Sequence, residues 1–283
     1  MIQGARRHRP GLLLGLALML LAQPASAVPA LLVATPEGLR PVAIIEGDKF
    51  FPPAREARLQ QILGNDLLEA KRELPLFENG EERMMFQLER FQVSPPGCAG
   101  AGLWLGKPER PLDRPLLSFS PDFPGPRRYV GNLPVAAYTK LAQEMSLKVY
   151  RAKRLSEPLL NAVKVRKLEA FTLMNGTRNF VSVASDVFSP AKACPDYSLL
   201  LILEKIGRRW QTQLEHFRHN TKDCAQYSLV GSFGTGSKID KLAVQGSSPT
   251  ARWYDLYQAQ SFGGLKKIFH GGGHSCLSQS VAH

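Results

Sequence analysis

The sequence predicts an α+β protein that is mostly antiparallel β, in which an N-terminal α/β portion precedes two four-stranded units. A helical apolar period marks the N-terminal part at Ala54–Leu74. Short apolar runs separated by glycine turns fill the C-terminal half, and their pattern recurs after 60 residues. With 44% hydrophobic residues, the chain has enough apolar material for a folded core.

The first 27 residues have the three parts of a secretion signal. Arg6, Arg7 and Arg9 form a positive start, an apolar run covers Gly11–Ala22, and Ala25–Ala27 supplies small residues for cleavage. The apolar run is shorter than the roughly 20 residues of a spanning helix, although a retained anchor and a twin-arginine route remain alternatives. We therefore expect a signal peptide at 1–27 and a mature chain that is periplasmic or secreted.

Residues 28–126 are expected to form the N-terminal α/β portion, and residues 127–283 the β-rich portion. The helical period at 54–74 has a charged opposite face and a break at Gly64-Asn65. Ser94–Pro126 is rich in proline and glycine and is expected to be mostly loop. The strands expected in this portion are Val42–Ile45, Met84–Val93, Leu103–Leu105 and Leu116–Phe119.

A basic run follows, with ten lysines and arginines between 127 and 167 and a short helix expected at Leu133–Lys148. The formal charge of the chain is +12, and loss of the three signal arginines leaves +9. Such an excess favours anionic partners, although a solvated face explains a charge run equally well. The predicted basic binding surface consists of Lys148, Arg151, Lys153, Arg154, Lys164, Arg166 and Lys167.

The C-terminal half reads as two copies of one unit, at about 168–217 and 227–274. In each copy a strand leads into a glycine turn, at Gly176 and Gly236, and three further strands follow. Two stacked units leave an open face, which the N-terminal portion must cover. A chance likeness between two hairpin-rich stretches is the alternative. The expected strands are 168–174, 180–183, 197–204 and 210–216 in the first copy and 227–233, 241–244, 252–258 and 265–270 in the second.

The unit resembles a degenerate FG-GAP repeat, the blade of integrin-type propellers. Gly234–Val244 matches the pattern of that family best: a glycine-rich turn, an acidic residue and a short apolar strand. The resemblance covers about a third of the chain and implies propeller-blade-like sheets. Only Asp240 occupies an acidic position, so the calcium site of the family is not expected here, nor any other metal or cofactor.

Four cysteines in an exported chain predict two disulfides, for which three connectivities are possible. No pair has the spacing of a redox or zinc motif. The shorter loop favours Cys194–Cys224, which leaves Cys98 to pair with Cys276.

Other motifs suggest chemistry only in part. Gly231–Lys238 has the glycines of a phosphate loop but the wrong order of serine and lysine. His270–Cys276 contains the His-Gly-Gly-Gly of an esterase oxyanion hole, but its Gly-His-Ser lacks the second glycine of a nucleophile elbow. Histidines at 216, 219, 270 and 274 suit zinc or copper, and the tryptophans and tyrosines could stack on sugars.

The sequence therefore favours a non-enzymatic exported binding protein for an anionic polymer or an acidic protein in the cell envelope. An inhibitor of the immunity type, which blocks a toxin, is a specific form of this hypothesis. The alternative is an envelope hydrolase for ester or cell-wall substrates. Nucleic acid is not an expected partner, and no integral membrane segment is expected after the signal.

Overall fold

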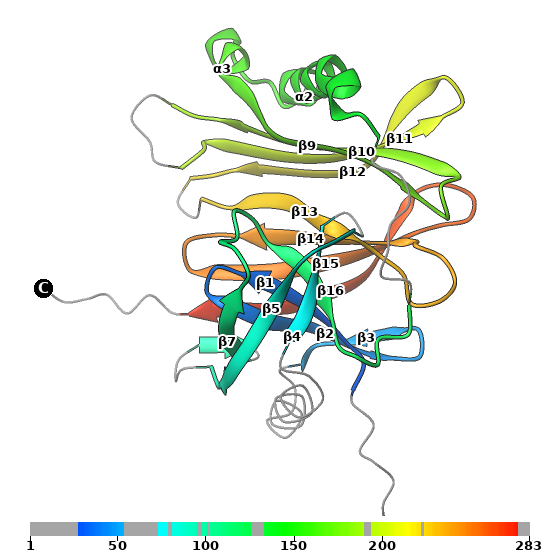
Figure 1. The fold of residues 1–283 in the computed structure, drawn as a ribbon. Helices are drawn as coiled ribbons and strands as arrows, with labels where there is room; N and C mark the ends of the chain where they lie inside the picture. Colours follow the sequence, from blue (N-terminus) through cyan, green and yellow to red (C-terminus); the bar gives the residue numbers. More distant parts are fainter. Residues whose placement is uncertain are drawn as a thin grey trace, which may run out of the picture.

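The protein is a stack of layers in a computed structural model, which describes residues 28–53, 73–78, 81–94, 98–100, 102–125, 133–189, 194–221 and 224–276. From one end, the layers are a helical layer, the sheet β9–β12, the sheet β13–β16 and an N-terminal barrel (Figure 1). The prediction of a mostly antiparallel β protein is confirmed. The expected signal at 1–27 and most of the expected helix at 54–74 lie outside the described residues.

The N-terminal portion, as far as it is described, is a closed β-barrel. Its strands follow the order β1-β8-β4-β5-β7-β2, and β1 also pairs with β2, so the sheet closes on itself. Trp104 and Phe86 fill the interior among aliphatic side chains. The strands are β1 (Ala30–Thr35), β2 (Gly38–Glu46), β3 (Lys49–Phe51, a hairpin on β2), β4 (Glu73–Glu78), β5 (Glu81–Gln92), β7 (Leu103–Pro108) and β8 (Leu116–Phe119).

All four strands expected in this portion are present, as parts of β2, β5, β7 and β8, although β5 ends one residue before Val93. The helical expectation is wrong at its end, because Glu73 and Leu74 belong to β4. Leu74 and Leu76 alternate into the barrel interior, so the period of two overrides the helical spacing here. Pro75, which directly follows the expected helix, lies inside this short strand.

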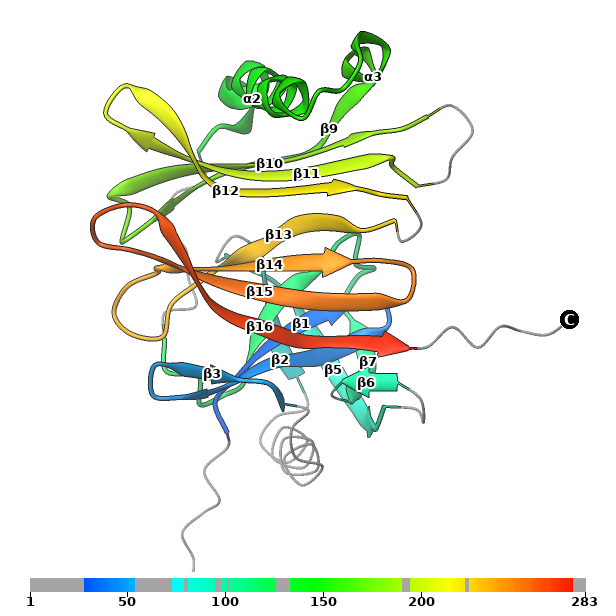
Figure 2. The same ribbon diagram turned by 180° about the vertical axis from the view of Figure 1, so that it is seen from behind.

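Two antiparallel meanders follow, each with four consecutive strands joined by hairpins (Figures 1 and 2). All eight strands expected in this half are found; whether the two units are copies of one ancestor stays a prediction. The strands are β9 (Val163–Leu173), β10 (Arg178–Val187), β11 (Tyr197–Ile206) and β12 (Arg209–His219), then β13 (Gln226–Phe233), β14 (Lys241–Ser247), β15 (Ala251–Ala259) and β16 (Leu265–Cys276). The short β6 (Cys98–Gly100) adds to the end of β16.

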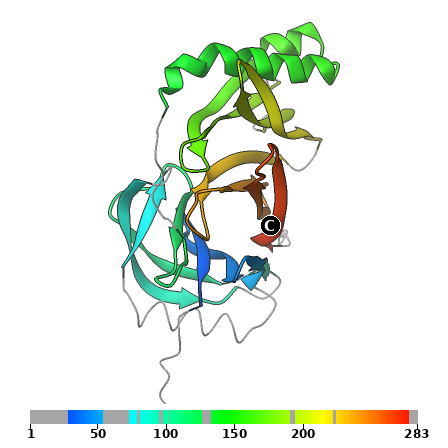
Figure 3. The ribbon, with the colours of Figure 1, turned by 90° about the vertical axis from the view of Figure 1, so that its right-hand side faces the viewer.

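The helical layer lies against the outer face of the first meander, as the side view also shows (Figure 3). It consists of a 3₁₀ turn η2 (Val135–Tyr138), α2 (Thr139–Ala152) and α3 (Glu157–Asn161). The helix expected at 133–148 is therefore present as α2, but it begins six residues later and ends four residues later. Tyr150 anchors it, because its buried hydroxyl donates to the carbonyl of Ser185 on β10 over 2.9 Å.

Apolar cores fill the three spaces between layers. Val181 and Leu201 face the helices, whereas Phe180 and Ile202 face the second meander. The other face of the second meander packs on the barrel, for example through Leu256. The open face of the second unit is thus covered by the N-terminal portion, and that of the first by the helices.

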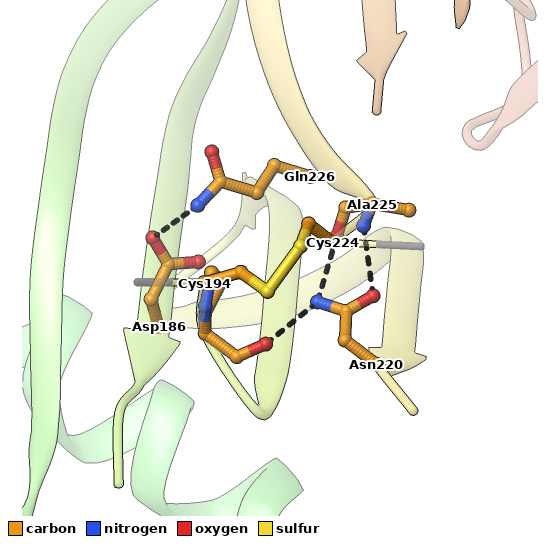
Figure 4. The surroundings of a disulfide bond; sticks show 7 residues. Asp186, Cys194, Asn220, Cys224, Ala225 and Gln226 are labelled. Atoms are coloured by element: carbon orange, nitrogen blue, oxygen red, sulfur yellow. Dashed lines mark hydrogen bonds between the residues drawn. A yellow bond between two sulfur atoms is a disulfide. The ribbon is translucent and has the colours of Figure 1, made fainter. Parts of the chain in front are cut away.

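A disulfide joins Cys194, before β11, to Cys224, in the connection between the two meanders, with 5.3 Å between the Cα atoms (Figure 4). The predicted pairing is confirmed. Asn220 supports it by donating to the carbonyls of Pro195 and Ala225 and accepting from the amide of Ala225. Such a bond is typical of proteins from oxidising compartments.

Cys98 is also disulfide-bonded. In the strand register its backbone lies opposite Cys276, as the predicted second pairing requires. The side chain of Cys276 lies outside the described residues.

We expect the double variant Cys194→Ala/Cys224→Ala to lose about 3–4 kcal/mol of unfolding free energy, because the bond closes a 30-residue loop in the unfolded chain. Urea unfolding followed by tryptophan fluorescence measures this loss against wild type. An unchanged midpoint and slope would contradict a stabilising role for the bond.

Candidate functional site

The solvent face of α2 carries part of the predicted basic surface. Ala142, Ser146 and Val149 face the sheet, which leaves Lys148 and Arg151 on the exposed side of the helix. Arg154 follows in a left-handed turn after the helix, with φ of 62°, and is also exposed.

Four of the seven predicted cations are exposed and make no side-chain hydrogen bond or ion pair within the described part of the chain. Three of them, Lys148, Arg151 and Arg154, lie on or directly after α2 and form what we call the basic helix surface, whereas Lys164 lies on β9, where its neighbours Val163 and Val165 face the helices. Unpaired cations at the surface keep their full charge for a partner, because no internal carboxylate neutralises them.

Lys153 has an internal partner instead. Its ammonium lies 2.9 Å from a carboxylate oxygen of Glu215 and over the ring of Phe217. It borders a hollow of about 260 Å³ between α2 and β12, which Met145 and Thr212 also line. This volume is below the roughly 300–1,000 Å³ of most small-molecule sites, so the hollow suits the end of a side chain or chain-like ligand.

Arg166 and Lys167 face the seam between the meanders. Arg166 donates to the carbonyl of Tyr227 over 3.0 Å and pairs with Asp186 at 2.7 Å. Lys167 donates to the carbonyl of Leu229 over 2.9 Å. Both therefore satisfy carbonyls of β13, the edge strand of the second sheet, and contribute to the fold rather than to an open binding surface.

Charge is distributed unevenly along the stack. The described residues from 133 to 219, which form the helical layer and the first meander, contain 13 lysines and arginines against 7 acidic residues. The described residues from 28 to 125, which form the barrel, contain 7 against 11. An anionic partner is therefore attracted to the helical end of the molecule and repelled from the barrel.

A second group of exposed cations lies on the β11–β12 hairpin and was not predicted from the sequence: Lys205, Arg208 and Arg209. Three cations around Ile206-Gly207 within five residues were the available signal. They were not predicted as a binding surface because they lie at the turn between two expected strands of the first unit.

The glycine run of β16 has a packing explanation. A Cβ on Gly272 would lie 1.8 Å from the carbonyl oxygen of Val42 on β2, and one on Gly273 would lie 1.6 Å from that of Arg252. Only glycine lets these three backbones approach so closely, and Gly272 also has a positive φ of 65°. The run lines a shallow hollow of about 480 Å³ with Trp253 and His274.

The neighbouring histidines do not join a serine in the structure. Nδ1 of His270 lies 2.7 Å from Oδ1 of the buried Asp255, which Lys267 also contacts at 3.0 Å. Among the described residues no serine hydroxyl hydrogen-bonds to His270 or His274. Ser275 follows His274 directly on β16, so the two side chains point to opposite faces of the strand.

Burial lowers the pKa of two histidines, His216 and His274. Desolvation, with the nearby Arg40 and Arg252, lowers the pKa of His274 to about 4. Desolvation also lowers the pKa of His216, whose Nε2 lies 2.8 Å from the hydroxyl of Tyr257. The part of the chain that the structure describes contains no group of three His, Cys, Asp or Glu side chains that could hold a metal ion.

The aromatic residues considered for sugar stacking mostly lie inside the protein. Trp104 and Tyr254 are fully buried, and Tyr257 is nearly so. Trp253 packs over Gly246 of β14, and Trp210 meets Tyr138 edge to face at 5.5 Å. Their alternating strand positions reflect the core.

No helix within the described residues is long and apolar enough to cross a membrane. No protein-family model matches the chain, and comparisons with curated proteins and with solved structures returned no match. The resemblance to FG-GAP repeats therefore stays a prediction. The function must therefore be inferred from the fold and from the exposed charges.

Gly272→Ala is expected to cost more than about 3 kcal/mol of unfolding free energy, because the methyl group overlaps the carbonyl of Val42. Gly47→Ala is the matched control: Gly47 has a similar φ of 59° but nothing within 4 Å of its Cβ position. It should lose only about 1 kcal/mol. Equal losses in urea unfolding would refute the close approach as the reason for the glycine.

The stability of the protein is expected to fall as the pH drops from 6.5 towards 4. The unfolded chain binds a proton at His274 in this range, whereas the folded state, with a pKa of about 4, resists it. His274→Asn should remove about 1 kcal/mol of this pH dependence, since solvent screens a half-buried ring. Unfolding free energies of both proteins across this range provide the measurement, and parallel curves would contradict the assignment.

Proposed function

We propose that the mature protein is an exported, non-enzymatic binding protein that holds an anionic envelope polymer or an acidic protein through the basic helix surface. Its place of action is the periplasm or the exterior of the cell. The observation that carries the proposal is the group of three exposed cations on and directly after α2, which make no side-chain hydrogen bond or ion pair with the described residues.

The form of the surface supports a large partner. Lys148, Arg151 and Arg154 project from the outermost layer of the stack, and the adjoining hollow of about 260 Å³ is too small to enclose a ligand. An open, convex, basic surface suits contact with an extended chain or with another protein surface. An immunity-type inhibitor of an acidic toxin is the specific form of this proposal that includes a protein partner.

The charge polarity supports a defined orientation. The acidic excess of the barrel disfavours binding of a polyanion at that end, so the partner meets the helical end first. Because such contacts are solvent-exposed, they weaken as salt rises and the Debye length shortens from about 10 Å at 0.1 M to about 3 Å at 1 M.

The test is retention of the purified protein on immobilised heparin and on immobilised poly-glutamate, used as a carbohydrate and a peptide polyanion. The variant Lys148→Glu/Arg151→Glu/Arg154→Glu should elute at clearly lower salt than wild type. Heparin retention alone points to a polymer, and poly-glutamate retention to an acidic protein.

The matched control is Lys49→Glu/Arg90→Glu/Arg110→Glu, which makes the same change in net charge on exposed residues of the barrel portion. It should elute close to wild type. Equal loss in both variants would show that net charge alone drives retention, and no loss in the helix variant would refute the proposed surface.

A further inference from the structure

Four of the six connections between consecutive strands of the two meanders lie at one end of the stack (Figures 1 and 2). We call this region the hairpin end, made of residues 174–177, 205–209, 235–240 and 260–264. Its turns are joined across the layers: the amide of Met174 donates to the carbonyl of Ile239 over 2.8 Å. This end is independent of the basic helix surface.

Two of these turns expose large apolar side chains. Phe262, at the tip of the β15–β16 hairpin, has a relative exposure of 105%. Ile206, where β11 turns into β12, is 42% exposed. Single exposed apolar residues are common, so Ile206 and Phe262 form one apolar feature only if their hairpins are linked.

Arg178 links the ends of these two hairpins. Its guanidinium donates to both carboxylate oxygens of Glu204, over 2.6 and 2.7 Å, and to the carbonyl of Gln260 over 2.6 Å. Glu204 lies two residues before Ile206, and Gln260 lies two residues before Phe262. A Cβ on Gly264 would lie 3.8 Å from the side chain of Gln213 on β12, so the hairpins also adjoin beyond the clamp.

The charges around these tips have one sign. Lys205, Arg208 and Arg209 surround Ile206, and Lys266 follows Phe262; all four are exposed. Of the acidic residues at this end, Glu204 pairs with Arg178 and Asp240 with Lys241, whose ammonium lies 2.8 Å away, while Asp48 of the β2–β3 hairpin lines a hollow with Lys238 at the 235–240 turn rather than at the two apolar tips. The surface offered to solvent is therefore apolar at its tips and cationic around them.

We propose that the hairpin end docks on an anionic lipid bilayer, with Phe262 and Ile206 entering the interface and the four cations contacting lipid headgroups. Apolar groups that project beyond a ring of Lys and Arg match the boundary between acyl chains and anionic headgroups. A soluble polyanion complements the cations but provides nothing for a fully exposed phenylalanine. The bilayer is therefore the occupant that accounts for both features.

Co-sedimentation with vesicles tests the proposal. Wild type should bind vesicles of phosphatidylethanolamine and phosphatidylglycerol and should not bind vesicles of phosphatidylcholine alone. Ile206→Ser/Phe262→Ser should weaken binding about tenfold or more, through loss of the inserted apolar area. Arg208→Gln/Arg209→Gln should weaken it in a salt-dependent way.

The matched control for insertion is Val93→Ser/Val135→Ser, which removes exposed apolar groups elsewhere. It should bind as wild type does. Phe262→Trp gives a second readout: its fluorescence should shift to the blue with anionic vesicles by more than that of wild type.

Three results would overturn the proposal: no vesicle binding by wild type, equal binding by Ile206→Ser/Phe262→Ser, or equal loss in the valine control. An unshifted tryptophan at position 262 would exclude insertion. The vesicle test changes residues outside the basic helix surface, and Ile206→Ser/Phe262→Ser leaves the net charge unchanged. A negative result in the polyanion test therefore does not contradict bilayer docking by the hairpin end.

Discussion

The structure depends on the requirement that each meander be covered on both faces. In β10, residues Phe180–Val187 are buried without interruption, and β11 is buried from Ser198 to Glu204. Because successive side chains of a strand point to opposite faces, an unbroken buried run requires a layer on either side. The helices, the two sheets and the barrel are the minimum stack that meets this requirement with two open-edged sheets.

Stacked sheets leave edge strands whose backbone groups need partners, and cations provide several of them. Arg166 and Lys167 of β9 reach carbonyls of β13, while Arg178 of β10 reaches a carbonyl after β15. Long basic side chains suit this task, since their stems cross apolar surface and their ends carry several donors. Part of the positive charge of the chain therefore stabilises the fold and is not available to partners.

The remaining charge lies where the stack ends. The outermost helices present one group of cations, and the turns of the meanders present another beside exposed apolar tips. The faces of the sheets are covered by neighbouring layers. There, glycines allow backbones to approach closely and aromatic side chains fill the cores. The shape of the molecule thus directs binding towards its exposed ends and away from the faces that hold it together.

Strand positions, hairpin turns and the Cys194–Cys224 pairing were determined by the sequence alone, because alternation, glycine turns and short loop length are local properties. The barrel closure was not, since β1 and β8 pair across more than 80 residues. Local sequence also could not show which cations of the basic run stay exposed and which bond to the fold. Lys164 and Arg166 are two residues apart, yet Lys164 faces solvent and Arg166 donates to a carbonyl of the edge strand β13. The glycines of β16 partly match an oxyanion-hole motif in the sequence, whereas in the structure they are contact points with β2 and β15. Which backbones and charges meet depends on how layers distant in sequence stack, and only the tertiary structure decides that.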